Sequence, residues 1–175
     1  MEIRKETPAD FDAIMNVTLA AARQHQVGKQ NGYFTLNALR KAGLLTLSLV
    51  AEIEGTIVGH VAFSPVHVSG GDKGWYALGP VSVLPECLSQ GIRKAMIAEG
   101  LEMLRQMHGK GVALVGDPDY FKPLGFMSAP QMASAKDMAD EFLIMSFDDR
   151  MPYGRFEFPD GFLPSQQVAH QGVLG

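Results

Sequence analysis

The chain has 175 residues, of which 46% are hydrophobic and 19% charged, and its formal net charge at pH 7 is −4. This composition is typical of one globular domain with a sizeable core and excludes a disordered chain. The acidic balance, without a basic stripe, argues against a nucleic-acid partner. No apolar run approaches the roughly 18–20 residues that span a bilayer, so we expect no membrane partner either.

The N-terminal half predicts a strand, two helices and a hairpin. Thr7 and Pro8 are a typical helix start, and apolar residues follow at helical spacing as far as Leu19. Gly55 divides two runs of alternating apolar residues, which is typical of a hairpin. We expect, in chain order, a strand over 3–5, a helix starting at Thr7, a helix over 35–45, and strands over 48–54 and 56–68.

The C-terminal half predicts a strand, the strongest helix of the chain and further strands. Pro80 lies inside the strand and cannot donate to a ladder, so Gly79-Pro80 indicates a β-bulge or a point where strands separate. We expect a strand over 75–84, a helix over 90–108, and strands over 112–115, 141–147 and 154–158. The fold class is therefore α/β (mixed α+β), with a sheet flanked by helices.

The junction between the strand at 75–84 and the following helix has the character of a phosphate site. The first N–H groups of a helix lack internal partners, and the macrodipole makes them attractive to anions. Gly91 lets backbone approach an anion closely, and Arg93 and Lys94 add positive charge. An ordinary strand–helix connection with a solvated basic face explains these residues equally well.

This stretch resembles the acetyl-coenzyme A (CoA) signature of the GNAT N-acetyltransferase superfamily, in which Gln/Arg-x-x-Gly-x-Gly/Ala follows a strand. Further segments resemble a bacterial predicted-acetyltransferase branch of that superfamily, over most of residues 2–162. They are 49–52, 59–66, 78–86, 116–121 with the following Gly125-Phe126, and 156–162. We therefore expect a GNAT domain over residues 1–162 and a C-terminal tail over 163–175.

The resemblance implies the GNAT acyl-CoA N-acyltransferase fold, with a central, mostly antiparallel sheet that splays at a β-bulge. It implies acetyl-CoA as co-substrate, no metal, and direct transfer of acetyl to a primary amine of a small molecule or peptide. Pantetheine would lie along the strand and pyrophosphate on the helix start. The implied donor-binding residues are Val81, Ser82, Val83, Ser89, Gln90, Gly91, Ile92, Arg93, Lys94, Asp117 and Phe121.

Three residues depart from the family's pattern. Leu88 replaces the first Gln or Arg of the signature, Arg93 replaces its last small residue, and Phe121 stands where a tyrosine usually protonates the leaving thiolate. Tyr120 is adjacent and is our candidate acid, while His60 is a candidate base. These departures leave two alternatives open: a non-catalytic acyl-CoA sensor and a degenerate GNAT scaffold.

Other expectations concern single residues and the tail. Asp117 contacts CoA or caps its turn, with equal support. The lone Cys87 lacks a neighbouring base and excludes a disulfide framework; with the charged, signal-free N-terminus it indicates a cytoplasmic protein. His60 and His67 match no metal-ligand spacing. The polar tail over 163–175 has little to bury by itself, so we expect a second subunit to hold it in a homodimer.

Overall fold

The structure is a computed structural model that describes residues 1–24 and 31–162. Its strands are β1 (Glu2–Lys5), β2 (Leu47–Ile53), β3 (Thr56–Pro65), β4 (His67–Val68), β5 (Trp75–Val83), β6 (Gly111–Val115), β7 (Met127–Ser128), β8 (Phe142–Ser146) and β9 (Phe156–Glu157). Its α-helices are α1 (Phe11–Gln24), α2 (Asn31–Lys41), α3 (Ile92–Gln106) and α4 (Pro118–Phe121). Short 3₁₀ turns connect several of these elements.

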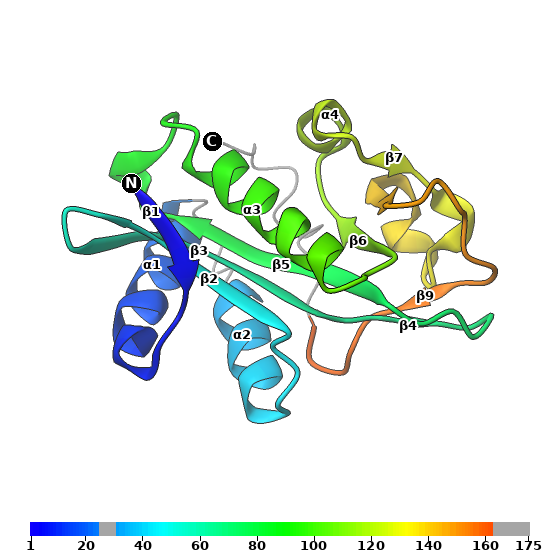
Figure 1. Ribbon diagram of the computed structural model, residues 1–175, viewed down its shortest axis with the longest axis horizontal. Coiled ribbons are helices and arrows are strands. Elements are labelled where there is room, and N and C mark those ends of the chain that lie inside the picture. Colours follow the sequence, from blue (N-terminus) through cyan, green and yellow to red (C-terminus); the bar gives the residue numbers. More distant parts are fainter. Residues whose placement is uncertain (25–30, 163–175) are drawn as a thin grey trace.

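The main sheet has seven strands in the order β1-β2-β3-β5-β6-β8-β7. Only the β5–β6 pair within it is parallel, and the other pairs are antiparallel. The parallel pair arises because α3 carries the chain from the end of β5 back to the start of β6. The expected mixed, mostly antiparallel sheet flanked by helices is therefore confirmed (Figure 1).

Helices cover the two faces of the sheet. The apolar stripe of α3 packs on β3 and β5, and Gly100 brings the helix so close that an added Cβ would lie 2.2 Å from the Phe63 ring. On the other face α1 and α2 lie away from α3 (Figure 1). Ile14 and Leu36 from these helices pack with Val50 and Ala62 of the sheet.

Several boundaries differ from those expected. The strand predicted over 56–68 ends at Pro65, and its last part forms β4, which pairs with β9 in a separate two-stranded sheet. The helix predicted over 35–45 runs instead over Asn31–Lys41. It includes Gly32, a poor helix former, because Gly32 packs closely on Pro80 and Thr18 of neighbouring elements. Tertiary packing thus overrides local propensity at this helix.

None of the helices in the described part of the chain is long and apolar enough to cross a membrane. Within residues 1–24 and 31–162, no group of three or more histidine, cysteine, aspartate or glutamate side chains is placed to hold a metal ion. The tail over 163–175, on which the homodimer prediction rests, lies outside the described residues.

Candidate active site

An opening forms where β5 and β6 separate. The two strands pair only as far as Ala77, whose register partner is Ala113. Beyond this point Leu114 and Val115 of β6 pair with β8, whereas β5 continues along β3 as far as Val83. The edge of β5 that faces β6 therefore has no strand partner there among the described residues. The expected splay is present, and the strand pairing ends at Ala77, just before the Gly79-Pro80 pair that the sequence indicated.

A bulge on β5 lies beside this opening. Val61 of β3 is opposite Val81, but Phe63 is opposite Leu78, so β5 has one more residue than β3 between these pairs. The extra residue falls at Gly79-Pro80, whose peptide bond is cis. Gly79 has φ +138°, a conformation that side chains rarely adopt. The bulge predicted from the sequence is therefore confirmed at the position that Gly79-Pro80 indicated.

The bulge also contacts elements on the α1 and α2 side of the sheet. A Cβ added to Gly32 at the start of α2 would lie 3.3 Å from Pro80 and 3.4 Å from Thr18 of α1. A Cβ added to Gly79 would lie 3.4 Å from the ring of Phe162. Gly32 and Phe162, which are far apart in the sequence, thus meet at the bulge, beside the end of the β5–β6 pairing.

The turn between β5 and α3 presents backbone in an unusual conformation. Ser89 and Gly91 both have left-handed φ values, +70° and +75°, and residues 89–91 are exposed. Gly91 is the residue before the first helical residue, Ile92, and an added Cβ there would meet nothing within 4 Å. A turn of this kind at the start of a 15-residue helix can bind a phosphate group.

Arg93 leaves this turn toward α4. Its guanidinium carbon lies 4.5 Å from the ring centre of Tyr120 and 5.4 Å from that of Phe121. Its Nε is buried and has no hydrogen-bond partner among the residues that the structure describes. Burial lowers the pKa of Arg93, and the negative charges of Tyr120, once it is ionised, and of Asp117 oppose this effect. The side chain therefore bridges the start of α3 and the segment that follows β6.

The α4 segment places its residues in different roles. Phe121 is 3% exposed and packs against Phe126 in the core. Tyr120 is half-buried on the edge of that core, and burial raises its pKa while the Arg93 charge opposes the rise. Asp117 accepts a hydrogen bond from the backbone N–H of Asp119 at 2.9 Å, so its carboxylate caps the short helix. The capping interpretation of Asp117 is thus confirmed, and a CoA contact stays a prediction.

His60 lies on β3, fully buried, opposite Ser82 of β5. Its Nε2 is 2.8 Å from the hydroxyl oxygen of Ser48, and that hydroxyl donates to Glu6. The hydroxyl oxygen therefore accepts from Nε2–H, which leaves the lone pair on Nδ1. Nδ1 is buried, and it lacks a hydrogen-bond partner in the part of the chain that the structure describes.

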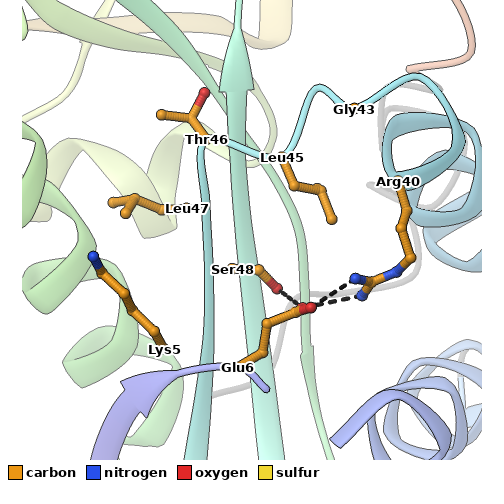
Figure 2. A pocket seen from close by; sticks show the side chains of 8 residues that line it. All are labelled: Lys5, Glu6, Arg40, Gly43, Leu45, Thr46, Leu47 and Ser48. Atoms are coloured by element: carbon orange, nitrogen blue, oxygen red, sulfur yellow. Dashed lines mark hydrogen bonds and ion pairs between the residues drawn. The ribbon is translucent and has the colours of Figure 1, made fainter. Parts of the chain in front are cut away.

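The network continues from Glu6 to α2. Arg40 donates two hydrogen bonds to the Glu6 carboxylate, at 2.6 and 3.0 Å. Figure 2 shows Glu6, Ser48 and Arg40 turned toward one another, while Lys5 points away from them. These residues line part of a cavity of about 340 Å³ at the junction of β1, β2 and α2.

Burial and charge have opposite effects in this network. Burial lowers the pKa of His60 to about 4; the Glu6 charge opposes that shift and the Arg40 charge adds to it. Burial raises the pKa of Glu6, but its bonds from Arg40 and Ser48 more than compensate, so the pKa lies below its usual value. At neutral pH the network therefore pairs an ionised Glu6 and Arg40 with a neutral His60.

A family model described as the acetyltransferase (GNAT) family matches residues 14–126. The chain belongs to this family. The Escherichia coli (strain K12) protein named uncharacterized N-acetyltransferase YhbS is 34% identical over 130 residues, which cover 72% of this chain and 73% of that protein. The GNAT fold that the sequence resemblance implied is therefore confirmed.

Two solved structures of GNAT proteins are similar to this chain over more than nine-tenths of its length. A GNAT family acetyltransferase from Brucella melitensis, in complex with acetyl-CoA, is 41% identical with a TM-score of 0.81, and the match covers 93% of this chain and 97% of that one. E. coli YhbS in complex with CoA is 28% identical with a TM-score of 0.80, over 92% of this chain and 91% of that one.

The residues that the sequence singled out form two groups in this GNAT fold. The expected donor residues lie along β5, the turn, the start of α3 and the α4 segment. They are Val81, Ser82, Val83, Ser89, Gln90, Gly91, Ile92, Arg93, Lys94, Asp117 and Phe121. The side chains of Val83, Ile92 and Phe121 are buried in the core. The second group is His60 with its network. Tyr120, the candidate acid, lies with the first group through its contact with Arg93.

Sequence reasoning missed the partners of His60. Glu6 follows β1, Ser48 lies on β2 and Arg40 lies on α2, and no short motif connects them. One local signal was available, because the polar Ser48 lies inside the otherwise apolar run 47–51, and the structure buries it. A buried hydroxyl on a strand needs a partner, which the cross-strand histidine supplies.

Proposed function

We propose that this chain transfers the acetyl group of acetyl-CoA to a primary amine of a small molecule or peptide. The observation that carries the proposal is the exposed left-handed turn at Ser89–Gly91 beside the unpaired edge of β5. A strand edge offers backbone groups to an extended pantetheine amide chain, and the turn offers amides to a diphosphate. The Brucella melitensis relative, at 41% identity, was solved with acetyl-CoA.

The reaction we propose is direct. The neutral amine nitrogen attacks the acetyl carbon of the thioester, the carbon–sulfur bond breaks, and CoA leaves as the thiolate. The nitrogen loses one proton to a base, and the thiolate gains one proton or leaves as the anion. Backbone N–H near Val81 stabilises the oxyanion of the tetrahedral intermediate, which is often the largest catalytic contribution.

Two side chains are proposed for proton transfer. Tyr120 is the acid candidate, supported by its position on α4 beside Arg93. His60 is the base candidate, supported by the unpartnered lone pair on Nδ1 and by Ser82, its cross-strand neighbour on the donor strand. Because burial makes His60 a weak base, we expect its contribution to be small.

A second function, an acyl-CoA sensor without turnover, is favoured by one observation. Phe121 is buried in the core with no hydroxyl, at the position where the family resemblance led us to expect a tyrosine. Because a thiol of pKa near ~8.5 is a fair leaving group at neutral pH, loss of this acid slows the reaction rather than preventing it. Release of free thiol from acetyl-CoA across a panel of amines separates the two functions.

Donor binding is tested by a matched pair of glycine variants. Gly91 and Gly55 have similar φ values, +75° and +79°, and an added Cβ meets nothing within 4 Å at either site. Gly91→Ala and Gly55→Ala should therefore lose similar stability, about 1–2 kcal/mol. Only Gly91→Ala should weaken acetyl-CoA binding, by about 10-fold in calorimetry, because its methyl group crowds the turn amides.

The wild-type protein decides the proposal as a whole. Measurable binding of acetyl-CoA together with amine-dependent thiol release supports the acetyltransferase function. Binding without release by any amine supports the sensor, and no binding at all supports a degenerate scaffold. Equal weakening by the two glycine variants would contradict the placement of the diphosphate on this turn.

A further inference from the structure

Arg93 connects the segment that follows β5 with the segment that follows β6. Its backbone lies in the first turn of α3, which follows β5, whereas its guanidinium lies over Tyr120 of α4, which follows β6. These two strands separate beyond Ala77 and Ala113, so the side chain joins the segments that follow the separated strands.

The bridge leaves the arginine incompletely satisfied. A guanidinium has five N–H donors and stays charged at neutral pH, so it cannot relieve its burial by releasing a proton. The Nε of Arg93 is buried without a hydrogen-bond acceptor among the described residues. The face of an aromatic ring attracts the cation but accepts none of its in-plane N–H groups in the geometry of a carboxylate or phosphate.

A diphosphate on the neighbouring turn would supply what the bridge lacks. Residues 89–91 are exposed, and only Ile92, the first residue of α3, separates Gly91 from Arg93. A phosphate held there would offer oxygens to two parallel N–H groups of the guanidinium, an interaction stronger than a neutral hydrogen bond. The unbranched stem of arginine has the rotamer freedom that such a change of partner requires.

We infer that Arg93 is a donor-specificity residue, which turns from the ring of Tyr120 onto the diphosphate when a donor binds. The inference rests on the proposed function, because it takes the turn at residues 89–91 as the diphosphate site. Its consequence is selection among acyl donors. A CoA thioester carries the diphosphate and gains the arginine contact, whereas a pantetheine thioester lacks the diphosphate and leaves Arg93 on the ring of Tyr120.

The test compares CoA with pantetheine, which shares the thiol arm but has no diphosphate. Arg93→Met keeps an unbranched side chain that can pack on Tyr120 and removes the charge. We expect its affinity for CoA to fall by about 10- to 100-fold, as for loss of a charged hydrogen bond. Its affinity for pantetheine, measured by calorimetry, should change less than about 3-fold.

A matched control is available on the same helix. Arg105, near the end of α3, lies 4.7 Å from the ring centre of Phe147, so it makes the same kind of stack far from the turn. Arg105→Met should leave the ratio of CoA to pantetheine affinity unchanged. If Arg93→Met does not fold, Arg93→Lys replaces it, and we expect the CoA-to-pantetheine ratio to fall several-fold because lysine lacks the planar fork.

The outcomes separate this inference from the proposed function. Wild-type protein that binds CoA, with an unchanged affinity ratio in the Arg93 variants, overturns the inference and leaves the proposed function standing. Tighter binding of both ligands by Arg93→Met also overturns the inference, because the arginine then only obstructs the binding site. Wild-type protein that binds no CoA overturns both.

Discussion

Lowering the pH from neutral should destabilise this protein through one buried histidine. The folded state holds the pKa of His60 at about 4, and an unfolded histidine titrates near 6.5. Between these values the unfolded chain binds a proton that the folded chain does not. By linkage, the stability that comes from neutral His60 is complete above about pH 6.5 and is lost as the pH falls toward 4.

The magnitude follows from the difference in pKa. The folded and unfolded pKa values of His60 differ by about 2.5, which corresponds to roughly 3 kcal/mol of unfolding free energy between pH 6.5 and pH 4. Between pH 7 and pH 5, where neighbouring carboxylates stay ionised, the loss should be about 2 kcal/mol. Glu6 adds a loss of the same sign, but only at lower pH, because its pKa lies below its usual value. The measurement therefore belongs above pH 5.

Urea unfolding at pH 7 and pH 5 measures this effect. Trp75 is the single tryptophan, 4% exposed and in edge-to-face contact with Phe156, so its fluorescence reports unfolding of the sheet. His60→Gln removes the titrating ring and keeps a polar group near the position of Nε2. We expect the stability difference between the two pH values to shrink by about 2 kcal/mol in this variant.

The exposed His67 of β4 provides the control, since His67→Gln removes a histidine that the sheet does not bury. This variant should keep the pH dependence of the wild type. If His60→Gln keeps it as well, the buried neutral histidine is not the origin of the acid sensitivity, and the reasoning fails.

Two further predictions concern catalysis and packing. Tyr120→Phe should lower turnover by less than a factor of ~10² in steady-state kinetics, because Tyr120 neighbours the usual acid position without occupying it; a loss of several thousand-fold with donor binding intact would contradict this. Gly100→Ala should lower the free energy of unfolding by about 1–3 kcal/mol, because the new Cβ meets the Phe63 ring at 2.2 Å. Glu99→Ala, at an exposed position of the same helix, should leave the stability unchanged. Equal urea midpoints for the two variants would refute the close approach of Gly100 to Phe63.

The parts of the fold that local chemistry determines could be predicted from the sequence. Pro80 cannot donate to a strand ladder and Gly79 accepts a positive φ, so this pair located the bulge. Gly91 likewise located the start of α3 to within two residues of the expected position. In each case the information lies in one or two residues whose backbone restrictions hold in any context.

The directions of the functional side chains could not be predicted in the same way. Arg93 lies over Tyr120, and that contact depends on how α3 and α4 are placed by the parting of β5 and β6. His60 fitted a substrate-facing base as well as a buried residue, because strand alternation assigns a face but not what covers it. Its cover comes from Glu6, Ser48 and Arg40, which only the tertiary structure brings together.

The different chemistry of the two basic side chains explains why they point to different roles. His60 and Arg93 each hold a buried nitrogen without a hydrogen-bond partner among the described residues. The histidine avoids the cost of burying a charge by staying neutral, and this is why its pKa is lowered. The arginine stays charged at neutral pH, and an anion would therefore stabilise it. Arg93 is the second residue of a helix whose first turn attracts phosphate. For this reason Arg93 is a stronger indicator of a ligand than His60.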